Sequence, residues 1–348
     1  MQPEKFIVKR GKDMKKILLS SGLNYYKANL HGHSTESDGV LTPEEVKKAY
    51  KEQGYSVIAL TDHEHLIDNS YLNDENFIIL TSCEVAIKEF PDMSTLVKTD
   101  MKVCHLNFIS KKADNVDTPC YSSVYDHFWN EGNKDKIVHT CGEYERVHTG
   151  ESISDMIRLA NENGFLVTYN HPRWSLENAS DYLGYKGLWA VEIYNTAVNR
   201  DGLYEYDINV YDDILRNGEK LACVSADDSH NTGHFFGGWV MINTDDFSYD
   251  GIIKALENHN FYASTGPVIK SLAIEGNKAI LTYEKGTYAA ISCKSRRSKK
   301  IFAENPGGEN VAVFDILPDK DGYVRFDVVD EEGNRANTNA YFCGDLFE

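Results

Sequence analysis

Short apolar runs alternate with amphipathic helical stretches from about Tyr25 to about Tyr262, and this alternation restricts the possible folds more than any other feature. The runs that have the length and composition of buried strands are SVIAL (56–60), FIILTS (77–82), VCHLNFI (103–109), FLVTYN (165–170), LWAVEIY (188–194) and LACVSA (221–226). Helices are indicated at 152–164 and 211–218, and also after Thr42, where Pro43 and Glu45 complete a capping box. Alternating strands and helices favour a mainly parallel α/β domain, either barrel-like or open.

Two other regions have a different pattern. After Pro267 come short alternating strands, separated by glycine and aspartate turns, that predict a small antiparallel β-sandwich: KSLAIEG, KAILTYEKG, TYAAISCKS, VAVFDILP and GYVRFDVVD. Between about Phe90 and Ile153 the alternation weakens, which indicates an insertion. Its aromatic residues either fill a local hydrophobic contact or stack on a base: Tyr121, Tyr125, Phe128 and Trp129. The predicted division is an N-terminal extension (1–24), an α/β domain (25–262) with the 90–153 insertion, and a β-sandwich domain (263–348).

Charge and cysteine usage narrow the classes of partner and compartment. The net charge of −18 repels phosphate backbones, so we expect no long nucleic acid as a partner. The seven cysteines are scattered and form no C-x-x-C pair, which argues against a disulfide framework. No segment resembles a signal peptide or reaches the roughly 18 apolar residues of a membrane span. A cytoplasmic protein without a membrane partner is therefore expected, and the sequence does not define its oligomeric state.

Histidines and carboxylates recur at the ends of the predicted strands. His31 and His33 follow a strand end at Leu30, and residues i and i+2 of an extended chain point to one side. Asp228 and His230 repeat this spacing. Because the carboxyl ends of parallel strands line one crevice, we expect nine candidate ligands to cluster there. They are His31, His33, Asp38, His63, Glu84, His105, His171, Asp228 and His230. This mixture predicts two or three divalent ions, zinc, manganese or iron rather than calcium, that share a bridging carboxylate.

Several of these candidates also have an interpretation that requires no metal. A strand-interior histidine such as His105 can pair with backbone groups, and Asp38 can belong to an Asp-Gly turn. Asp227 competes with Asp228 as a ligand, although the D-x-H spacing favours Asp228. The position of Asp62 fits capping or support of a ligand better than ligation.

The ordered set of motifs resembles the PHP (polymerase and histidinol phosphatase) superfamily over roughly residues 25–262. The motifs are YKANLHGHSTESDG, ALTDHE, the Glu84 region, CHLNF, YNHPRW and SADDSH. This resemblance implies a distorted seven-stranded (β/α) barrel with a metal cluster at the carboxyl ends of the strands. FYASTGP followed by a β-sandwich is similar to the branch that includes nucleotide phosphoesterases and carbaryl-hydrolase-like metallohydrolases.

The resemblance also implies how the nine ligands divide among three metal positions. One position takes His31, His33 and Asp228, with Glu84 as the bridging carboxylate. A second position takes Glu84, His105 and His171, and a third takes Asp38, His63 and His230. All nine positions hold residues of the expected type.

The function that these residues predict is hydrolysis, most directly of a phosphoester in a small phosphorylated molecule such as a nucleotide. In this hypothesis a metal-bridging hydroxide attacks phosphorus in line. Arg173 clamps the phosphate, and either His65 or His234 protonates the leaving group. One alternative is hydrolysis of a carbamate or carboxylic ester by the same cluster. Another is a non-catalytic binding module that the metals stabilise.

Overall fold

The computed structural model describes residues 15–90, 100–128, 137–204 and 206–347, and it divides into two compact units. The larger one, called the α/β unit, comprises Leu23–Thr265 together with Asn337–Asn339. The smaller one, called the β unit, comprises the rest of the described chain. Among the described helices, none combines the length and the apolar character that a membrane crossing requires.

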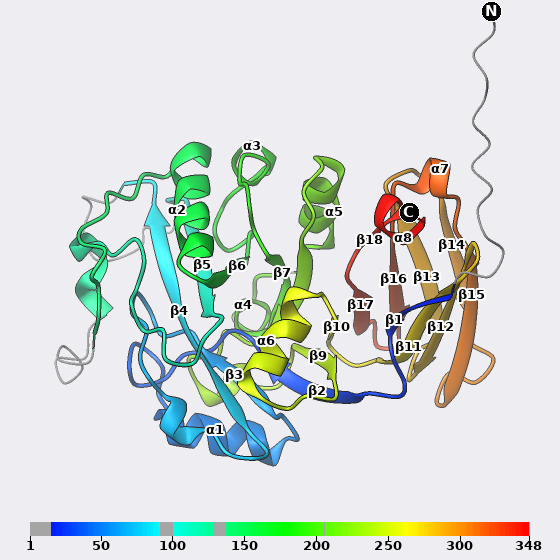
Figure 1. Cartoon of the computed structure of the whole chain (residues 1–348), viewed down its shortest axis with the longest axis horizontal. Helices are drawn as coiled ribbons and strands as arrows, with labels where there is room; N and C mark the ends of the chain where they lie inside the picture. Colours follow the sequence, from blue (N-terminus) through cyan, green and yellow to red (C-terminus); the bar gives the residue numbers. More distant parts are fainter. Residues whose placement is uncertain (1–14, 91–99, 129–136, 205, 348) are drawn as a thin grey trace, which may run out of the picture. The chain divides into compact units, whose positions relative to one another are not determined.

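The strands of the α/β unit form a mixed sheet (Figure 1). Their bounds are β2 (Asn24–Asn29), β3 (Val57–Leu60), β4 (Ile78–Lys88), β5 (Val103–Ser110), β6 (Phe165–Tyr169), β7 (Ala190–Asn195), β8 (Ala222–Ala226), β9 (Trp239–Thr244) and β10 (Phe261–Ser264). They follow the order β10-β9-β2-β3-β4-β5-β6-β7-β8. Neighbours are parallel from β2 to β4 and from β6 to β8, whereas β5 is antiparallel to both β4 and β6, and β9 to both β2 and β10.

The predicted α/β class is therefore correct, but the predicted strand directions and the predicted barrel are not borne out in full. A mainly parallel arrangement is wrong at β5 and at β9–β10, and a seven-stranded barrel is not confirmed. Asn339 links the two ends of this strand order. Its Oδ1 accepts a hydrogen bond from Cys223 N of β8 (3.0 Å), and its Nδ2 donates to Phe261 O of β10 (2.9 Å).

Three of the six described α-helices of this unit, the first, second and fifth, lie within three residues of where the sequence indicates them, and the sequence analysis predicts none of the other three. Their bounds are α1 (Pro43–Glu52), α2 (Gly150–Glu162), α3 (Ala179–Tyr182), α4 (Thr196–Arg200), α5 (Ile208–Arg216) and α6 (Tyr249–Glu257). The capping box of α1 is present, because Glu45 N donates to Thr42 Oγ1 (3.3 Å) and Thr42 N donates to Glu45 Oε2 (2.9 Å). Helix α2 begins two residues earlier than predicted, since Thr149 caps it through Ser152 N.

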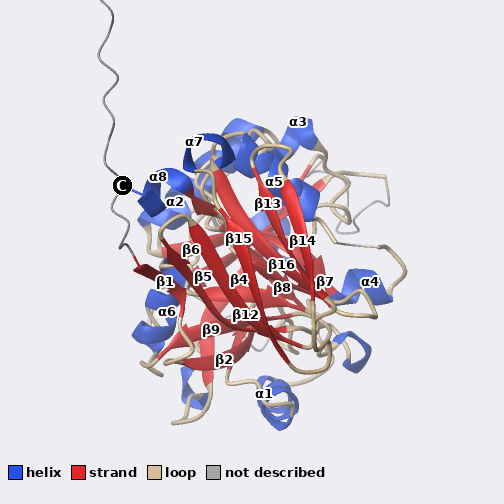
Figure 2. Cartoon of the chain, turned by 90° about the vertical axis from the view of Figure 1, so that its right-hand side faces the viewer, coloured by secondary structure: helices blue, strands red, loops and turns tan. Residues whose placement is uncertain are grey.

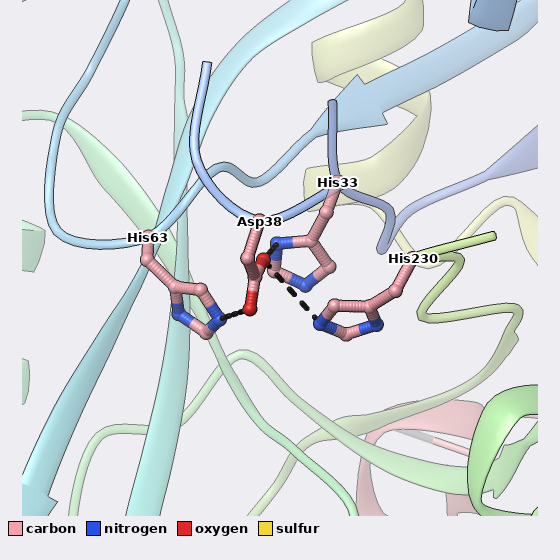
Figure 3. Close-up of side chains that lie close together, drawn as sticks. All are labelled: His33, Asp38, His63 and His230. Carbon is pink, nitrogen blue, oxygen red and sulfur yellow. Dashed lines mark ion pairs between the residues drawn. The ribbon is translucent and has the colours of Figure 1, made fainter. Parts of the chain in front are cut away.

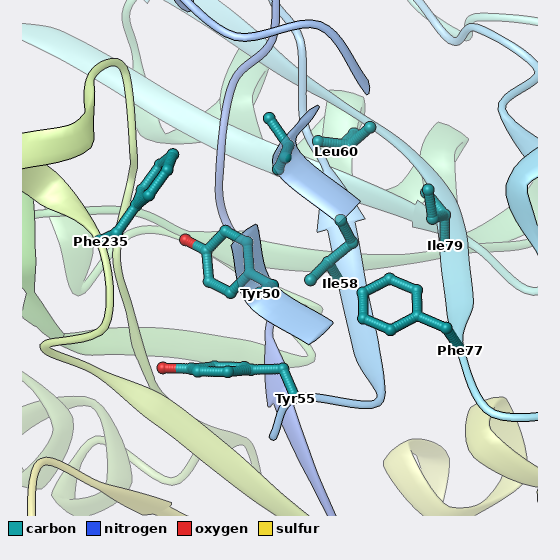
Figure 4. Close-up of a cluster of buried hydrophobic side chains, with 8 residues drawn as sticks. Tyr50, Tyr55, Ile58, Leu60, Phe77, Ile79 and Phe235 are labelled. Atoms are coloured by element: carbon teal, nitrogen blue, oxygen red, sulfur yellow. The ribbon is translucent and has the colours of Figure 1, made fainter. Parts of the chain in front are cut away.

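Helix α1 packs its apolar face against β3 and β4 (Figure 4). The buried residues of this cluster are Val46, Tyr50, Tyr55, Ile58, Leu60, Phe77, Ile79 and Phe235. Val46 and Tyr50 are four residues apart, so they share one face of the helix. The Tyr50 hydroxyl donates to Asp227 Oδ2 (2.9 Å), which connects this core to the loop after β8.

The β unit is an antiparallel structure, as predicted, and strands dominate the chain as a whole (Figure 2). One sheet has the order β1 (Lys15–Leu19), β11 (Val268–Glu275), β12 (Lys278–Glu284) and β15 (Glu309–Asp315). The other strands are β13 (Tyr288–Cys293), β14 (Ser298–Phe302), β16 (Tyr323–Val329), β17 (Arg335–Thr338) and β18 (Tyr341–Phe342), with the short helices α7 (Pro318–Asp321) and α8 (Cys343–Phe347). Phe314 of β15 contacts Phe326 of β16, with ring centroids 5.5 Å apart, so side chains of two sheets meet face to face.

Two predicted segments lie partly outside the described residues. Of the N-terminal extension (1–24), residues 1–14 are not described, and Lys15–Leu19 form a strand that pairs with β11. Of the 90–153 insertion, residues 91–99 and 129–136, which include Trp129, and the side chain of Phe128 are not described. The described part of the insertion includes β5, Tyr125 and Arg146.

Candidate metal centre

Four strands of the α/β unit end directly before a candidate ligand, as the sequence predicts. His31 and His33 follow β2, His63 follows β3, His171 follows β6, and Asp228 follows β8. Strand β3 runs parallel to β2 and to β4, and two antiparallel pairings, β4 with β5 and β5 with β6, give β6 the direction of β4 again. Strands β7 and β8 keep that direction, so the carboxyl ends of β2, β3, β6 and β8 face the same side of the sheet. The polar residues therefore meet at one edge although up to 197 positions separate them in the chain (His31 to Asp228, 228 − 31).

Glu84 and His105 reach the same place by a different route. The predicted strand 77–82 continues to Lys88, so Glu84 lies inside β4 rather than after it. His105 lies inside β5 and is paired in register with Ala86, two residues from Glu84. Its Nδ1 lies 3.1 Å from Glu84 Oε1, so the imidazole pairs with a carboxylate and not with the backbone.

The nine candidate ligands form three overlapping groups, within each of which the donor atoms lie within 4.8 Å of one another. The groups are His31, His33, Glu84 and Asp228; Glu84, His105 and His171; and His33, Asp38, His63 and His230. This partition follows the one that the resemblance implies, except that His33 also joins the third group. Glu84 and His33 each belong to two groups, so the three positions are contiguous.

Glu84 and Asp228 are the carboxylates of the first two groups. His31 Nε2 lies 3.3 Å from Glu84 Oε1 and 3.2 Å from Asp228 Oδ1, and His33 Nε2 lies 3.0 Å from Asp228 Oδ1. His171 Nε2 lies 3.3 Å from Glu84 Oε1. One carboxylate oxygen of Glu84 thus faces three imidazoles, which is the arrangement expected of a bridging ligand.

Asp38 is the carboxylate of the third group, and it lies among three imidazoles (Figure 3). Its oxygens are 3.4 Å from His63 Nε2, 3.6 Å from His230 Nε2 and 3.8 Å from His33 Nδ1. The Asp-Gly turn suggested by the sequence is present as well. A Cβ on Gly39 would meet the His33 carbonyl carbon at 2.6 Å, so glycine is required for the loop to fold back toward His33.

Burial and the neighbouring charged groups shift the pKa values of the candidate ligands in opposite directions. Burial acts to raise the pKa of Glu84 and of Asp228, but the neighbouring histidines outweigh it and hold both pKa values well below the usual range. Burial acts to lower the pKa of His63 and of His171, but the nearby carboxylates outweigh it and raise each pKa to about 9. Burial and the neighbouring His230 lower the pKa of His33 to about 4.

The donor set fits divalent transition metals. Among the described residues, none forms a hydrogen bond with the buried atoms His31 Nε2 and His33 Nδ1, although carboxylate oxygens lie close to both, as expected of atoms oriented toward a shared ion. Six imidazoles with three carboxylates are ligands that zinc, manganese and iron accept and that calcium does not prefer. Mutual repulsion among the histidines that carry protons would be relieved when metal ions replace those protons.

Comparison with known proteins gives distant structural likenesses. No protein-family model and no curated protein sequence matches the chain. It is similar to a solved two-domain protein from Bacteroides vulgatus that contains a predicted PHP-like metal-dependent phosphoesterase, with 14% identity, a TM-score of 0.46, and coverage of 96% of this chain and 99% of the other. A proposed metal-dependent phosphoesterase from Bifidobacterium adolescentis (15% identity, TM-score 0.37) and an amidohydrolase from Chromobacterium violaceum (16% identity, TM-score 0.33) each cover 59% of this chain and 88% of theirs.

At these identities and TM-scores the likenesses carry no argument about chemistry, which follows from this chain's own side chains.

Glu192 contacts the candidate ligands and was missed by the sequence predictions. Its Oε1 lies 3.0 Å from His31 Nδ1, and its Oε2 accepts hydrogen bonds from His171 N (3.0 Å) and Asn195 Nδ2 (3.0 Å). Asn195 Nδ2 also donates to Asp228 Oδ2 (3.0 Å). Glu192 therefore orients His31 and His171 directly, and Asp228 through Asn195. The available signal was a single glutamate inside the apolar run LWAVEIY.

Asp62 and Asp227 support the centre without belonging to any ligand group among the described residues. Asp62 accepts hydrogen bonds from Ser34 N, Ser34 Oγ and Ser37 Oγ, each at 2.8 Å, and so fixes the loop that carries Asp38. These contacts agree with the supporting position predicted for Asp62, and its role toward a metal stays a prediction.

Asp227 anchors the loop that follows His230. It accepts hydrogen bonds from three successive backbone N–H groups, those of residues 236–238, at 2.7–3.0 Å. Thr196 Oγ1 also donates to it at 2.7 Å. A Cβ at Gly237 would meet Thr196 Cγ2 at 2.5 Å, so the close approach requires glycine. Asp228, in contrast, takes a left-handed backbone conformation (φ 51°), which turns its side chain toward the histidines.

A cavity of about 450 Å³ opens onto the ligands. Seven of the nine candidates line it, all except His31 and His33. Part of the wall is apolar and consists of Ala86, Trp174, Ala197, Val198 and Leu203. The remaining lining residues are Lys88, Asp201 and His234.

Of the three residues predicted to act on substrate, only His234 lines the cavity. His234 lines the cavity, and its Nε2 lies 3.2 Å from Asp201 Oδ1. His65 is buried and does not line this cavity; its ring centroid is 6.1 Å from that of Tyr121. Arg173 is exposed and is not among the lining residues. The roles predicted for these residues stay predictions.

Proposed function

We propose that the chain is a metal-dependent hydrolase that cleaves a phosphoester in a small phosphorylated molecule. The observation that carries this proposal is the position of Glu84. Its carboxylate is shared by two of three contiguous donor groups, and it lines the cavity. Structural metal sites are usually closed and mononuclear, so a contiguous set that faces a cavity favours catalysis over a purely structural role.

Divalent ions held by these residues would supply a polarised phosphoryl group and a water molecule with a lowered pKa. The protein's own residues keep the donors in place. Glu192 fixes the ring of His31 through Nδ1, which directs Nε2 toward Glu84 and Asp228. Asn195 holds the outer oxygen of Asp228, and Asp62 holds the loop of Asp38. His234, which contacts Asp201, is positioned at the cavity to donate a proton to a leaving group.

A small substrate fits the cavity better than a polymer. Its volume of about 450 Å³ lies within the range of small-molecule sites, and the chain's net charge of −18 disfavours long nucleic acid. The apolar wall of Trp174, Val198 and Leu203 would contact an organic body attached to the scissile group.

A second candidate function is hydrolysis of a carbamate or carboxylic ester. The observation that favours it is the exposure of Arg173, since the predicted phosphate clamp does not line the cavity. A neutral carbonyl substrate would need no such clamp, and the apolar wall would accept its substituent.

The test is a substrate screen with a matched pair of variants. The full chain, loaded with Mn²⁺, Fe²⁺ or Zn²⁺, is assayed with aryl and nucleoside phosphomonoesters, aryl carboxylic esters and aryl carbamates. We expect phosphate release by the wild type, and a loss of roughly a hundredfold or more in kcat for Glu84→Gln, because the shared ligand is weakened. Glu75→Gln is the control, since Glu75 is exposed and outside the cavity. Turnover of carbamates or esters alone, or full activity in Glu84→Gln, would contradict the proposal.

A further inference from the structure

Lys88, the last residue of β4, lines the cavity and belongs to none of the three ligand groups. It is only 4% exposed, although lysine is almost never buried unless it is paired. Among the described residues no carboxylate forms an ion pair with it. Its Nζ lies 5.3 Å from the ring centroid of Tyr125, and burial lowers the pKa of the amine, partly against the charge of Glu64.

Glu64 does not explain the position of this lysine, because its carboxylate already has partners. Arg146 Nη1 donates to Glu64 Oε2 at 2.6 Å, and Ala86 N donates to Glu64 Oε1 at 3.0 Å. Arg146 Nη1 also donates to Ala86 O (2.9 Å). The charge of Glu64 is therefore balanced by Arg146, and the ammonium group of Lys88 remains available to the cavity.

The register of β4 separates Lys88 from the metal ligands. Glu84, Ala86 and Lys88 alternate along the strand, so they share the face that lines the cavity. At about 3.3 Å per residue, the backbone of Lys88 lies roughly 13 Å beyond that of Glu84. Ala86 and its cross-strand neighbour His105 lie between them. A ligand that contacts both the metal groups near Glu84 and the ammonium group of Lys88 must therefore carry two polar groups joined by an intervening body.

Apart from His105, the surface between the two ends is apolar. Ala86 belongs to a buried cluster with Met101, Val103 and Tyr125, and Trp174 packs against this cluster. Ala86 and Trp174 also line the cavity. An aromatic or aliphatic body fits this stretch better than a second charged group would.

We propose that Lys88 binds an anionic group of the substrate that is distinct from the scissile phosphate. The chain then selects small molecules in which an apolar body joins two anionic groups, the second being a carboxylate or a phosphate. This inference rests on the proposed function for the identity of the first group. It makes Lys88 a specificity-determining residue and assigns it no part in bond cleavage.

The test uses non-hydrolysable probes, so that binding is measured apart from turnover. Isothermal titration of the Mn²⁺-loaded full chain compares three phosphonates. Two have a second anionic end, (4-carboxybenzyl)phosphonate and p-xylylene diphosphonate, and the third, the isosteric (4-carbamoylbenzyl)phosphonate, has a neutral amide there. We expect the wild type to bind one or both of the probes that have an anionic group at each end more tightly than the amide probe. The difference in affinity should be on the order of tenfold to a hundredfold, as for a hydrogen bond to a charged group. Which probe gains more identifies the second group as carboxylate or phosphate.

Lys88→Met should abolish this preference and leave the affinity for the amide probe unchanged, whereas Lys88→Arg should retain much of it. Lys48→Met, on the exposed side of α1, is the control and should keep the wild-type ratio. An equal preference in wild type and Lys88→Met, or no binding of any probe, would overturn the inference. If the preference depends on Lys88 but the corresponding aryl phosphates are not hydrolysed, only the proposed function is contradicted. If these phosphates are hydrolysed but the probes with two anionic ends are not preferred, only the role of Lys88 is contradicted.

Discussion

At the scale of single residues, the centre depends on polar side chains that come from within apolar strands. Glu84 and Glu192 are each 1% exposed, and each is surrounded by hydrogen-bonding partners rather than by solvent. A buried carboxylate is costly unless it is paired, so such residues indicate a functional site when they recur on neighbouring strands.

Glu192→Gln should weaken metal binding without unfolding the chain. The amide can still contact His31 Nδ1, but it lacks the charge that raises the basicity of the imidazole. We expect roughly tenfold to hundredfold lower affinity, measured by competition with a chelating indicator dye at constant pH. Glu219→Gln, which removes an acid at the surface ion pair with Lys186, is the control. Equal affinity in Glu192→Gln and wild type would show that Glu192 has no positioning role.

At the scale of elements, β4 connects the metal groups to the rest of the cavity. It carries Glu84 at the metal groups and Lys88 farther along the cavity. Strand β3 ends before β4 does, so side chains bond to the backbone of β4 there. The Glu64 carboxylate accepts a hydrogen bond from Ala86 N, and the Arg146 guanidinium donates one to Ala86 O. The Glu64–Arg146 ion pair thus takes the place of a strand partner.

Arg146→Met should lower the free energy of unfolding by roughly 3–5 kcal/mol, because it leaves the Glu64 carboxylate buried and unpaired. Urea denaturation measures this change. The double variant Glu64→Met with Arg146→Met should recover much of the loss, since no charge is then left buried. Arg158→Met, at an exposed ion pair on α2, should cost less than about 1 kcal/mol. A loss in Arg146→Met no larger than in Arg158→Met would contradict the role of the pair.

The elements also show which features a sequence can predict. Ligands at strand ends, such as His31, His63 and His171, were found because the end of an apolar run is visible in the sequence. Glu84 was placed after a strand because its own charge interrupted the apolar pattern, whereas β4 continues for four more residues (88 − 84). The antiparallel pairing of β5 depends on contacts between distant segments, which local periodicity does not report.

At the scale of the whole molecule, the chain combines a strongly acidic composition with a site made of three carboxylates and six histidines. Divalent cations would reverse the local charge, so that an anion can approach a protein with a net charge of −18. The β unit contributes no residue to the three ligand groups. The boundaries of both units depend on segments far apart in sequence, Lys15–Leu19 on β11 and Asn339 between β8 and β10, which the sequence pattern did not reveal.

The most direct measurement is the number of ions that each chain binds. The full chain and three variants are equilibrated with Mn²⁺ or Zn²⁺, dialysed, and analysed by plasma mass spectrometry against protein concentration. The wild type should retain two or three ions. Asp38→Ala and His171→Ala, which affect the third and second groups separately, should each lose about one ion, and Glu84→Gln should lose more. Fewer than two ions in the wild type, or an unchanged number in Glu84→Gln, would contradict a shared metal cluster at this site.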